Sequence, residues 1–437
     1  MHDVRNKRVT VAGLGRFGGG ISVAKWLVAE GAKVLVTDRD PAEKLADSVK
    51  QLDGLPIEFR LGGHRHEDFS SPDLVVTSPA IPPTNEFLQT ARKAGIPITT
   101  EIVLFVERCP AEQVLGVTGT KGKSTTSAML GQMLQTKHTT WFGGNIGRSL
   151  LSDLPKIARR DLVLLELSSF MLHYLGELKW SPHVGVITML SADHLDWHGS
   201  ADAYLADKAN LIRFQKSSDF AVLNDENEPS RALRRDAKAK IVPFGLAGRE
   251  PFELLIPGRH NQLNAQAAFA AAGVMGVMRQ QAQAVLREFK GLPHRLQLVH
   301  EDARTGIRYF NDSIATIPEA AVAALESFPE RTVVQIVGGH DKGLPIDAMC
   351  EALARRAKAV LCIGKTGPKV AEGVGRAGGQ ATQTAHECGD LAAAMTKARQ
   401  IATRGDVVLL STGYASYDQF TNFEQRGETF ARLAREA

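Results

Sequence analysis

Short apolar runs alternate with helix-like segments along most of this 437-residue chain, and this alternation limits what it can fold into. Before residue 40 the chain holds a strand-like run, a helix-like run and a second strand-like run, which are KRVTVAG, ISVAKWLVAEG and AKVLVTD. Such an order builds a parallel sheet with helices packed against it. The alternation restarts at EQVLGVTG and again after GLPHRLQLV. The sequence therefore predicts an α/β protein made of three similar units.

The length of the chain supports this division, because 437 residues are too many for one hydrophobic core. We expect an N-terminal domain over residues 1–109, a central domain over 110–291 and a C-terminal domain over 292–437. The first and last are expected to be Rossmann-like. The central one is expected to have the parallel sheet of a P-loop ATPase.

Composition excludes several classes of protein. A net charge of +4 without a dense Lys/Arg tract is not typical of a nucleic-acid-binding protein. The four cysteines are scattered without CxxC spacing, which argues against a disulfide framework and favours a reducing compartment. No signal peptide is recognised, and the longest small-apolar run, residues 267–278, is too short to span a bilayer. We expect a cytoplasmic enzyme without membrane insertion.

A glycine loop, GLGRFGGG (13–20), lies between the first strand-like run and the first helix-like run. It matches the dinucleotide-binding pattern GxGxxG, and Asp38 follows at the end of the next strand. Such glycines let backbone N–H groups approach a diphosphate at a helix N-terminus. Alone, the loop is compatible with a nicotinamide or flavin cofactor, with a nucleotide-sugar diphosphate, or with a tight turn that binds nothing.

A second glycine loop, GVTGTKGKSTT (116–126), follows another strand and opens another helix. In a phosphate-binding loop the backbone amides surround phosphates, a lysine at Lys123 reaches their terminal oxygens and a hydroxyl at Ser124 holds Mg²⁺. The glycine expected five positions before Gly122 is absent, since Val117 stands there. The pattern predicts nucleotide binding despite this departure.

Three further segments in the central part carry candidates for metal chemistry. Glu166 ends a buried strand, where its carboxylate can contact a metal or simply cap a neighbour. The loop SADHLDWHG carries two histidines, His194 and His198, which by themselves leave zinc open beside a hard cation. Lys208 lies in a helix-like stretch and, taken alone, is interpreted as a solvated lysine.

Several motifs in order along the chain resemble those of the Mur ligases, the ATP-dependent amino-acid-adding enzymes of peptidoglycan synthesis. These motifs are TGTKGKST, GGNIG, LELSSF, DHLDWHG with a later lysine, PGRHNQLNA, LPHRL, NDSIAT and NFEQRG. GGNIG, LELSSF, NFEQRG and the dinucleotide-like first domain look most like the member that adds D-glutamate to UDP-N-acetylmuramoyl-L-alanine. Folylpolyglutamate synthase shares the ATPase and C-terminal plan but resembles this first domain less.

The resemblance implies roles for residues in every domain. Catalytic roles fall to Lys123, Glu166, His194 and Lys208, and metal contacts to Ser124, Glu166, His194 and Lys208. ATP contacts fall to Gly116, Val117, Thr118, Gly119, Thr120, Lys121, Gly122, Lys123, Ser124, Thr125, Asn261, Asn264, Arg295 and Asp312. UDP-substrate contacts fall to Gly15, Arg16, Phe17, Asp38, Arg39, Ser78 and Asn145. Contacts with the incoming amino acid fall to Thr316, Lys342, Ser416, Tyr417 and Phe423.

The resemblance also implies the reaction and its cofactors. ATP would convert the substrate carboxylate to an acyl phosphate, which the glutamate amine attacks, in peptidoglycan and cell-wall synthesis that supports cell shape and division. Two Mg²⁺ ions are expected, with Lys208 carbamylated so that it holds the second ion. The expected partners are UDP-N-acetylmuramoyl-L-alanine and glutamate, with no nucleic acid and with the chain acting as a monomer.

Departures from the family pattern leave one alternative open. Ile314 stands where the D-glutamate-adding enzymes usually carry lysine, and Gly413 and Tyr414 are unusual in STGYAS; Ala80 and Lys121 also differ from common choices. Because an apolar Ile314 cannot supply the same charge, L-glutamate is the alternative acceptor. A nicotinamide-dependent oxidoreductase and a non-catalytic nucleotide-binding switch are the competing classes.

Overall fold

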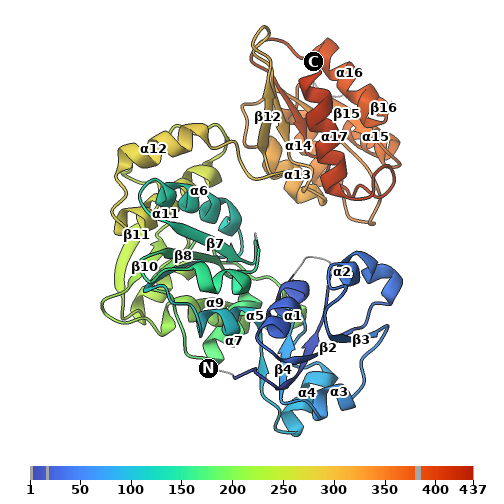
Figure 1. Ribbon diagram of the computed structural model, residues 1–437. Coiled ribbons are helices and arrows are strands. Elements are labelled where there is room, and N and C mark those ends of the chain that lie inside the picture. The colour runs from blue at the N-terminus through green and yellow to red at the C-terminus, as the bar shows by residue number, and fades with distance from the viewer. Residues whose placement is uncertain (1–2, 16–18, 147, 379–384, 437) are drawn as a thin grey trace. The chain divides into compact units, whose positions relative to one another are not determined.

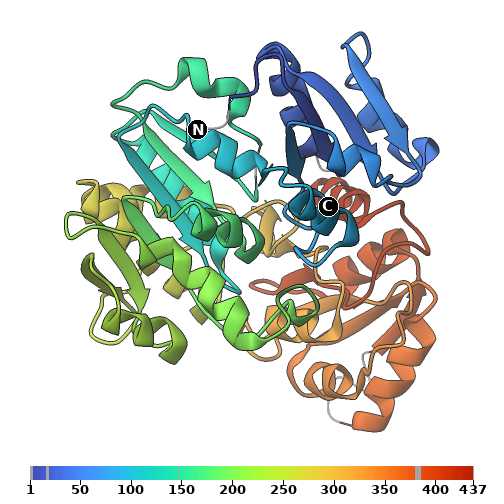
Figure 2. The same cartoon turned by 90° about the horizontal axis from the view of Figure 1, so that it is seen from below.

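The computed structural model describes residues 3–15, 19–146, 148–378 and 385–436 of the chain. Within these residues three separate sheets are found, each packed against helices (Figures 1 and 2). The predicted α/β class with three sheet-containing units is confirmed.

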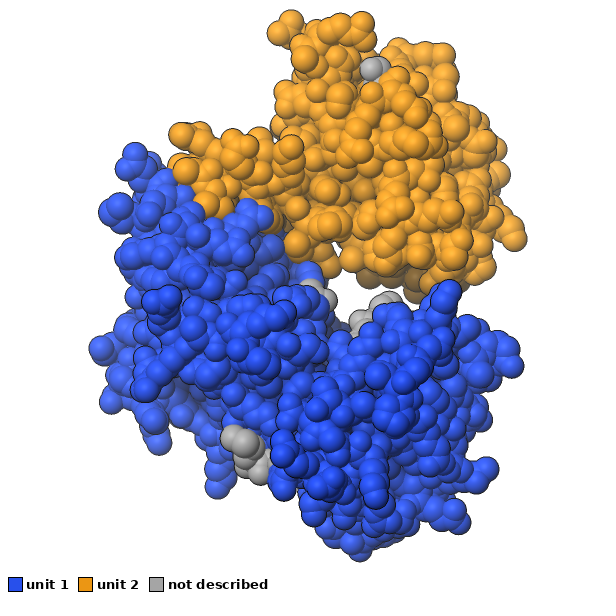
Figure 3. All heavy atoms as spheres, in the orientation of Figure 1, with its two compact units in different colours: residues 1–250, 263–282 blue, residues 251–262, 283–437 orange. Residues whose placement is uncertain are grey.

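By its internal contacts the chain falls into two compact units (Figure 3). One comprises residues 1–250 and 263–282, and the other comprises residues 251–262 and 283–437. The first unit contains two of the three sheets and the second unit contains the third. The domain boundaries after residues 109 and 291 stay predictions.

The N-terminal sheet is parallel, with the strand order β3-β2-β1-β4-β5 among the described residues. Its strands are β1 (Arg8–Ala12), β2 (Lys33–Asp38), β3 (Ile57–Leu61), β4 (Leu74–Thr77) and β5 (Ile98–Thr99). Its helices are α1 (Gly19–Ala29), α2 (Ala46–Lys50), α3 (Glu67–Ser70), α4 (Glu86–Lys93) and α5 (Glu101–Val106), with a 3₁₀ turn at Ala42–Leu45. Since β1 pairs with both β2 and β4, the chain reverses its winding beside β1, where open α/β sheets bind ligands.

The central sheet is also parallel, with the strand order β11-β10-β9-β6-β8-β7. Its strands are β6 (Gln113–Thr118), β7 (Thr140–Gly144), β8 (Leu162–Glu166), β9 (Val184–Ile187), β10 (Phe220–Asn224) and β11 (Lys240–Phe244). Its helices are α6 (Lys123–Gln135), α7 (Ser169–Glu177), α8 (Leu195–His198), α9 (Ala201–Arg213), α10 (Glu228–Ala232), α11 (Arg259–Val274) and α12 (Arg279–Glu288), and its 3₁₀ turns are Leu151–Lys156 and Leu233–Arg235. Because β6 lies between β8 and β9, the segments that follow these three strands meet at one edge of the sheet.

The third sheet has the order β12-β13-β17-β14-β15-β16, and only β12 runs antiparallel to its neighbour among the described strands. Its strands are β12 (Gln297–Glu301), β13 (Arg308–Asn311), β14 (Val333–Val337), β15 (Ala359–Ile363), β16 (Ala385–Gly389) and β17 (Val407–Leu410). Its helices are α13 (Pro318–Leu325), α14 (Asp347–Arg356), α15 (Gly367–Ala377), α16 (Leu391–Ile401) and α17 (Phe423–Arg435). Alternate strand residues enter two cores: Val333 and Val407 pack with α13, α14 and α15, whereas Val334 and Val408 pack with α16 and α17.

No helix in the described part of the chain combines the length and the apolar character that a membrane span needs.

Candidate active site

The second glycine loop leaves the centre of the central sheet, between β6 and α6, as the sequence predicts. Residues 116–118 are the buried end of β6, residues 119–122 form the loop and residues 123–125 begin α6. Gly119 and Gly122 have φ values of 152° and 87°, in the region that favours glycine. A Cβ atom at Gly119 would lie 2.0 Å from Thr188 Oγ1, and one at Gly122 would lie 2.4 Å from Asn264 Oδ1. Both glycines are therefore required by the packing of neighbouring segments against the loop.

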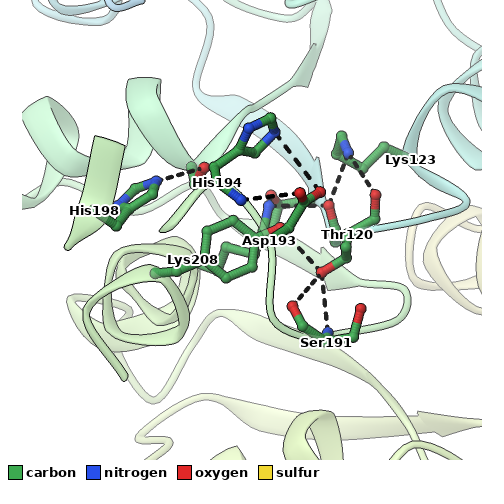
Figure 4. A network of polar contacts seen from close by, with 11 residues as sticks. Thr120, Lys123, Ser191, Asp193, His194, His198 and Lys208 are labelled. Atoms are coloured by element: carbon green, nitrogen blue, oxygen red, sulfur yellow. Dashed lines mark hydrogen bonds and ion pairs between the residues drawn. The ribbon is translucent and has the colours of Figure 1, made fainter. Parts of the chain in front are cut away.

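Lys123 turns back over this loop (Figure 4). Its Nζ donates to the carbonyl oxygens of Gly119, at 2.8 Å, and of Thr120, at 3.1 Å. The Thr120 hydroxyl in turn donates to the carbonyl of Ser191, at 3.0 Å, and accepts from the Ser191 N–H. The loop after β9 is thus bonded to the phosphate loop, and the Lys123 ammonium group lies where phosphate oxygens would meet the loop.

Lys208 of α9 lies against the same loop and is buried, with 1 % of its surface exposed, so its interpretation as a solvated lysine is wrong. Its Nζ donates to Gly119 O at 2.9 Å and to Thr118 Oγ1 at 3.4 Å. Burial, with a smaller contribution from the nearby Lys123 charge, lowers the pKa of Lys208 to about 7. A large fraction of this side chain is therefore a neutral amine near neutral pH.

Glu166 ends β8 and is fully buried. One carboxylate oxygen, Oε1, accepts from Asn145 Nδ2 at 2.8 Å, while Oε2 has no hydrogen-bond partner among the described atoms. A buried carboxylate oxygen without a partner suits a hard cation such as Mg²⁺, which prefers oxygen ligands. Ser124, at the first turn of α6, is half-buried in the same sheet edge. Glu166 and Ser124 are therefore candidates to hold a magnesium ion beside nucleotide phosphates.

His194 lies on the loop after β9, at the residue before α8, with a left-handed φ of 48°. Its side chain is half exposed, and its Nε2 lies 3.7 Å from Asp193 Oδ2 (Figure 4). Its ring also packs on Phe170, with centroids 4.9 Å apart. In the part of the chain that is described, no three His, Cys, Asp or Glu side chains form a metal-binding group, so the zinc alternative gains no support.

His198, the second histidine of this loop, does not face an open position. Its side chain is fully buried, with Nε2 3.0 Å from Ser169 Oγ and Nδ1 3.0 Å from Asp207 Oδ2. Asp207 also accepts from His173 Nδ1, at 3.2 Å, and this hydrogen bond raises the pKa of His173. Burial lowers the pKa of His198. Sequence reasoning missed Ser169, Asp207 and His173, because no spacing along the chain links them.

The first glycine loop borders a cavity of about 350 Å³ inside the first unit. The lining includes these predicted substrate residues: Gly15, Ser78 and Asn145. Asp38 is buried; its Oδ2 accepts from the Gly15 N–H at 3.0 Å and its Oδ1 from the Asp40 N–H at 2.9 Å. Arg39 is exposed and is not among the lining residues, and Arg16 and Phe17 lie outside the described residues. Three of the seven predicted UDP-substrate residues therefore line this cavity.

The predicted nucleotide residues beyond the loop divide between the two compact units. In the first unit, Asn264 accepts from Thr126 Oγ1 at 3.3 Å, which places it directly beside the phosphate loop. In the second unit, Asn261 Nδ2 donates to Pro257 O at 2.6 Å and Arg295 is exposed. Asp312 follows β13, and burial raises its pKa to about 7 while it accepts from the Ser411 hydroxyl at 2.7 Å.

The predicted amino-acid residues lie in the second unit, on segments that follow β13, β14 and β17. Ser416 is buried, Thr316 and Phe423 are half-buried, and Lys342 and Tyr417 are exposed; Tyr417 exposes 69 % of its surface. The carboxyl ends of parallel strands are the edge at which open α/β sheets bind ligands.

The unusual residues of STGYAS have a structural explanation. The Tyr414 side chain is part of the core that contains α13 and α14, so it does not extend from the loop. Gly413 has a φ of 69°, and a Cβ atom there would lie 2.7 Å from Met349 Sδ. Arg426 of α17 is almost fully buried and donates to Ser313 O at 2.8 Å and Tyr414 O at 3.1 Å, which ties this loop to NDSIAT. Ile314 itself is half-buried.

Three family models together match about four fifths of the chain. The Mur ligase MurD-like N-terminal domain matches residues 7–100, the Mur ligase middle domain matches 117–251 and the Mur ligase glutamate ligase domain matches 294–412. Among solved structures, the UDP-N-acetylmuramate-alanine ligase MurC of Thermotoga maritima has a TM-score of 0.60 at 21 % identity, covering 98 % of both chains. MurF of Acinetobacter baumannii has a TM-score of 0.58 at 17 % identity, covering 100 % of this chain and 92 % of its own. At these identities the structural matches establish the fold.

Curated relatives are more similar. The UDP-N-acetylmuramoylalanine--D-glutamate ligase of Roseiflexus sp. (strain RS-1) is 40 % identical, covering 99 % of both chains. The enzymes of the same name from Anaeromyxobacter dehalogenans (strain 2CP-C) and Symbiobacterium thermophilum are 36 % and 35 % identical, covering 99 % and 98 % of this chain and 98 % and 97 % of their own. Identity of this extent over whole chains, together with the three matched domains, shows that this chain belongs to the Mur ligase family.

Proposed function

We propose that this protein is an ATP-dependent ligase that joins D-glutamate to the alanine carboxylate of UDP-N-acetylmuramoyl-L-alanine during peptidoglycan precursor synthesis. The observation that carries the proposal is the convergence of Lys123 and Lys208 on one phosphate loop beside the buried, partly unpartnered Glu166. Relatives that are 34–40 % identical over almost the whole chain carry the name of this activity and support the choice of substrates.

The chemistry explains why such a loop is needed. A carboxylate is a poor electrophile, so the γ-phosphoryl group of ATP is first transferred to it, giving an acyl phosphate and ADP. The glutamate amine then attacks the acyl carbon, phosphate leaves and an amide remains. The Lys123 ammonium group and the loop N–H groups stabilise the charge that develops on the transferred phosphoryl group. Exclusion of water protects the acyl phosphate.

We assign the cation site to Ser124, Glu166 and His194, with Lys208 as a further ligand. A Mg²⁺ ion bound there would neutralise phosphate charge and orient the phosphates. Lys208 supplies the unprotonated amine that adds to CO₂, because its pKa is lowered to about 7; the addition gives a carbamate and releases one proton. A carbamate at this position is an anion and suits a second ion.

We assign the cavity beside the first glycine loop to the UDP-substrate. Loop N–H groups would bind a diphosphate that does not react, as at other helix N-termini in α/β folds. Asn145 lines this cavity and also donates to Glu166, so it links the substrate side to the cation side. The amino-acid assignments to Thr316, Lys342, Ser416, Tyr417 and Phe423 stay proposals, as do a cytoplasmic location and a monomeric state.

The test is release of inorganic phosphate by purified protein with ATP, Mg²⁺ and UDP-N-acetylmuramoyl-L-alanine, comparing D-glutamate with L-glutamate. We expect release with D-glutamate and a product heavier by one glutamate residue in mass spectrometry. Release only with L-glutamate would change the proposed acceptor to L-glutamate. It would also connect this acceptor with Ile314, which stands where the D-glutamate-adding enzymes usually carry lysine. Absence of release with either acceptor would contradict the proposal.

A further inference from the structure

The three residues assigned to the cation besides Ser124 come from three separate segments. Glu166 ends β8, His194 precedes α8 and Lys208 lies in α9. None of these three, which we call the metal-side residues, is hydrogen-bonded to another of them in the described contacts. Their relative positions therefore depend on how the three segments are fixed to one another.

A chain of hydrogen bonds connects these same segments behind the site. Ser169 follows Glu166 by three positions and Asp207 directly precedes Lys208. His198, four positions after His194, joins them, with its Nε2 3.0 Å from Ser169 Oγ and its Nδ1 3.0 Å from Asp207 Oδ2. We call Ser169, His198 and Asp207 the relay.

The relay has the atom order of a Ser-His-Asp catalytic triad, but its burial argues against a nucleophile. Ser169 exposes 2 % of its surface and the His198 side chain exposes none. The Phe170 ring stacks on His198, with centroids 5.6 Å apart and planes at 16°, which adds an apolar cover. A substrate carbonyl cannot reach the Ser169 hydroxyl, so the relay acts on the position of its neighbours.

The geometry of α9 makes this influence direct. Consecutive residues of a helix project about 100° apart, so fixing Asp207 also fixes the direction in which Lys208 extends. Asp207 is bonded on one side of α9 to His198 and His173, while Lys208 reaches the phosphate loop. The relay and the metal-side residues therefore belong to the same three segments, and a shift of one set moves the other.

We propose that the relay residues are positioning residues that hold the three metal-side residues in register for magnesium-dependent phosphoryl transfer. The inference rests on the proposed function for its kinetic readout. Groups that hydrogen-bond directly to metal ligands change metal affinity or activity by about 10- to 100-fold when they are removed. We take this as the scale for the relay, which acts through the backbone of the same three segments. We expect kcat to fall within that range, while the KM for the UDP-substrate stays unchanged.

The test uses three variants of the full-length protein in a double-mutant cycle. Ser169→Ala removes a hydroxyl at one end of the relay, and Asp207→Asn removes a carboxylate at the other end. Among the described hydrogen bonds, these two residues are joined only through His198, so their effects on kcat should be coupled. The double variant should lose little more activity than the worse single variant. Asp202→Asn, an exposed residue of the same helix, is the matched control and should match the wild type.

A second readout does not depend on turnover. ADP binding is measured by calorimetry with Mg²⁺ and again with a chelator. In the two relay variants we expect ADP to bind as in the wild type without Mg²⁺, and the Mg²⁺-dependent gain in affinity to fall about 10-fold or more. This readout still tests the relay if the wild type releases no phosphate with glutamate. Failure of the proposed ligase activity can therefore be told apart from failure of the positioning role of the relay.

Two results would overturn the proposal. One is that both single variants keep the wild-type kcat and the wild-type Mg²⁺-dependent gain in ADP affinity. The other is a double variant whose loss is the product of the two single losses, which would mean two independent structural roles. If Asp207→Asn does not fold, Ser169→Ala decides alone, because it removes one hydroxyl and leaves the packing of α7 in place.

Discussion

The two glycine loops of this protein share a local sequence pattern, but the side chains that hydrogen-bond to them carry opposite charges. Both join a buried strand to a helix, β1 to α1 and β6 to α6. Under the first loop lies a carboxylate, Asp38, which accepts the Gly15 N–H. Against the second loop lie two lysines, Lys123 and Lys208, which both donate to Gly119 O. A glycine pattern alone therefore identifies a phosphate-type turn, and the side chains around it decide whether charge can develop there.

This difference predicts which loop supports the chemistry. A diphosphate that only binds needs N–H groups, whereas a phosphoryl group in transfer needs cationic groups placed before the reaction begins. We therefore expect changes at the second loop to act on kcat and changes at the first loop to act on the KM of the UDP-substrate.

The largest expected effect is that of Lys123→Ala. Removing one preorganised donor from a developing charge typically lowers kcat by about 100- to 1,000-fold. We expect the upper end, because a lysine donor opposes negative charge more strongly than the neutral donor to which this range refers. Phosphate release is the measurement, with the KM for the UDP-substrate as internal control. A variant that keeps more than about a tenth of the wild-type kcat would show that the loop does not act through this lysine.

For Lys208 we predict an effect on folding stability, seen as its dependence on pH. Burial lowers its pKa from 10.5, the ordinary value for lysine, to about 7 in the folded protein, so between these pH values the unfolded chain binds more protons. Stability relative to Lys208→Met should therefore rise from pH 7 towards pH 10 in CO₂-free buffer, with a slope of at most about 1.4 kcal/mol per pH unit. Below pH 7 the full penalty for the buried charge remains.

Chemical unfolding of both proteins across this pH range measures the difference. Lys238→Met, at an exposed lysine, is the control and should show no such slope. A flat difference between the wild type and Lys208→Met would mean that Lys208 is charged throughout, and it would remove the neutral amine on which carbamate formation depends.

The elements that could be predicted from the sequence are those formed by a continuous stretch of the chain. The strands before both loops, and the helices that follow them, were recognisable because apolar runs and glycines stand next to each other in the chain. The direction of β12 was not predictable, because an apolar run does not say with which neighbour it pairs or in which sense.

The site was predictable only in part, for the same reason. The phosphate loop is contiguous, so its position at the end of β6 was expected. The burial of Lys208 was not, because one lysine in a helix gives no sign of the surface that it faces. The contacts between Ser169, His198 and Asp207 join three segments and exist only after the sheet has brought those segments together.

The smallest expected effect concerns Asp38 of the first loop. Asp38→Asn keeps the size of the side chain but leaves one oxygen to accept hydrogen bonds, whereas the carboxylate accepts from the N–H groups of both Gly15 and Asp40. One of these N–H groups would lose its partner, which loosens the first loop at a cost of about 1 kcal/mol. We expect binding of the UDP-substrate to re-order the loosened loop, so that the KM for the UDP-substrate rises by up to about fivefold.

We expect kcat and the KM for ATP to stay unchanged in Asp38→Asn, since the second loop is untouched. Asp47→Asn, at an exposed position of α2, is the matched control. Initial-rate kinetics with each substrate varied in turn separates the two loops. A fall in kcat without a change in the KM of the UDP-substrate would mean that the first loop takes part in the chemical step. The assignment of substrate binding to the first loop and of phosphoryl transfer to the second would then be wrong.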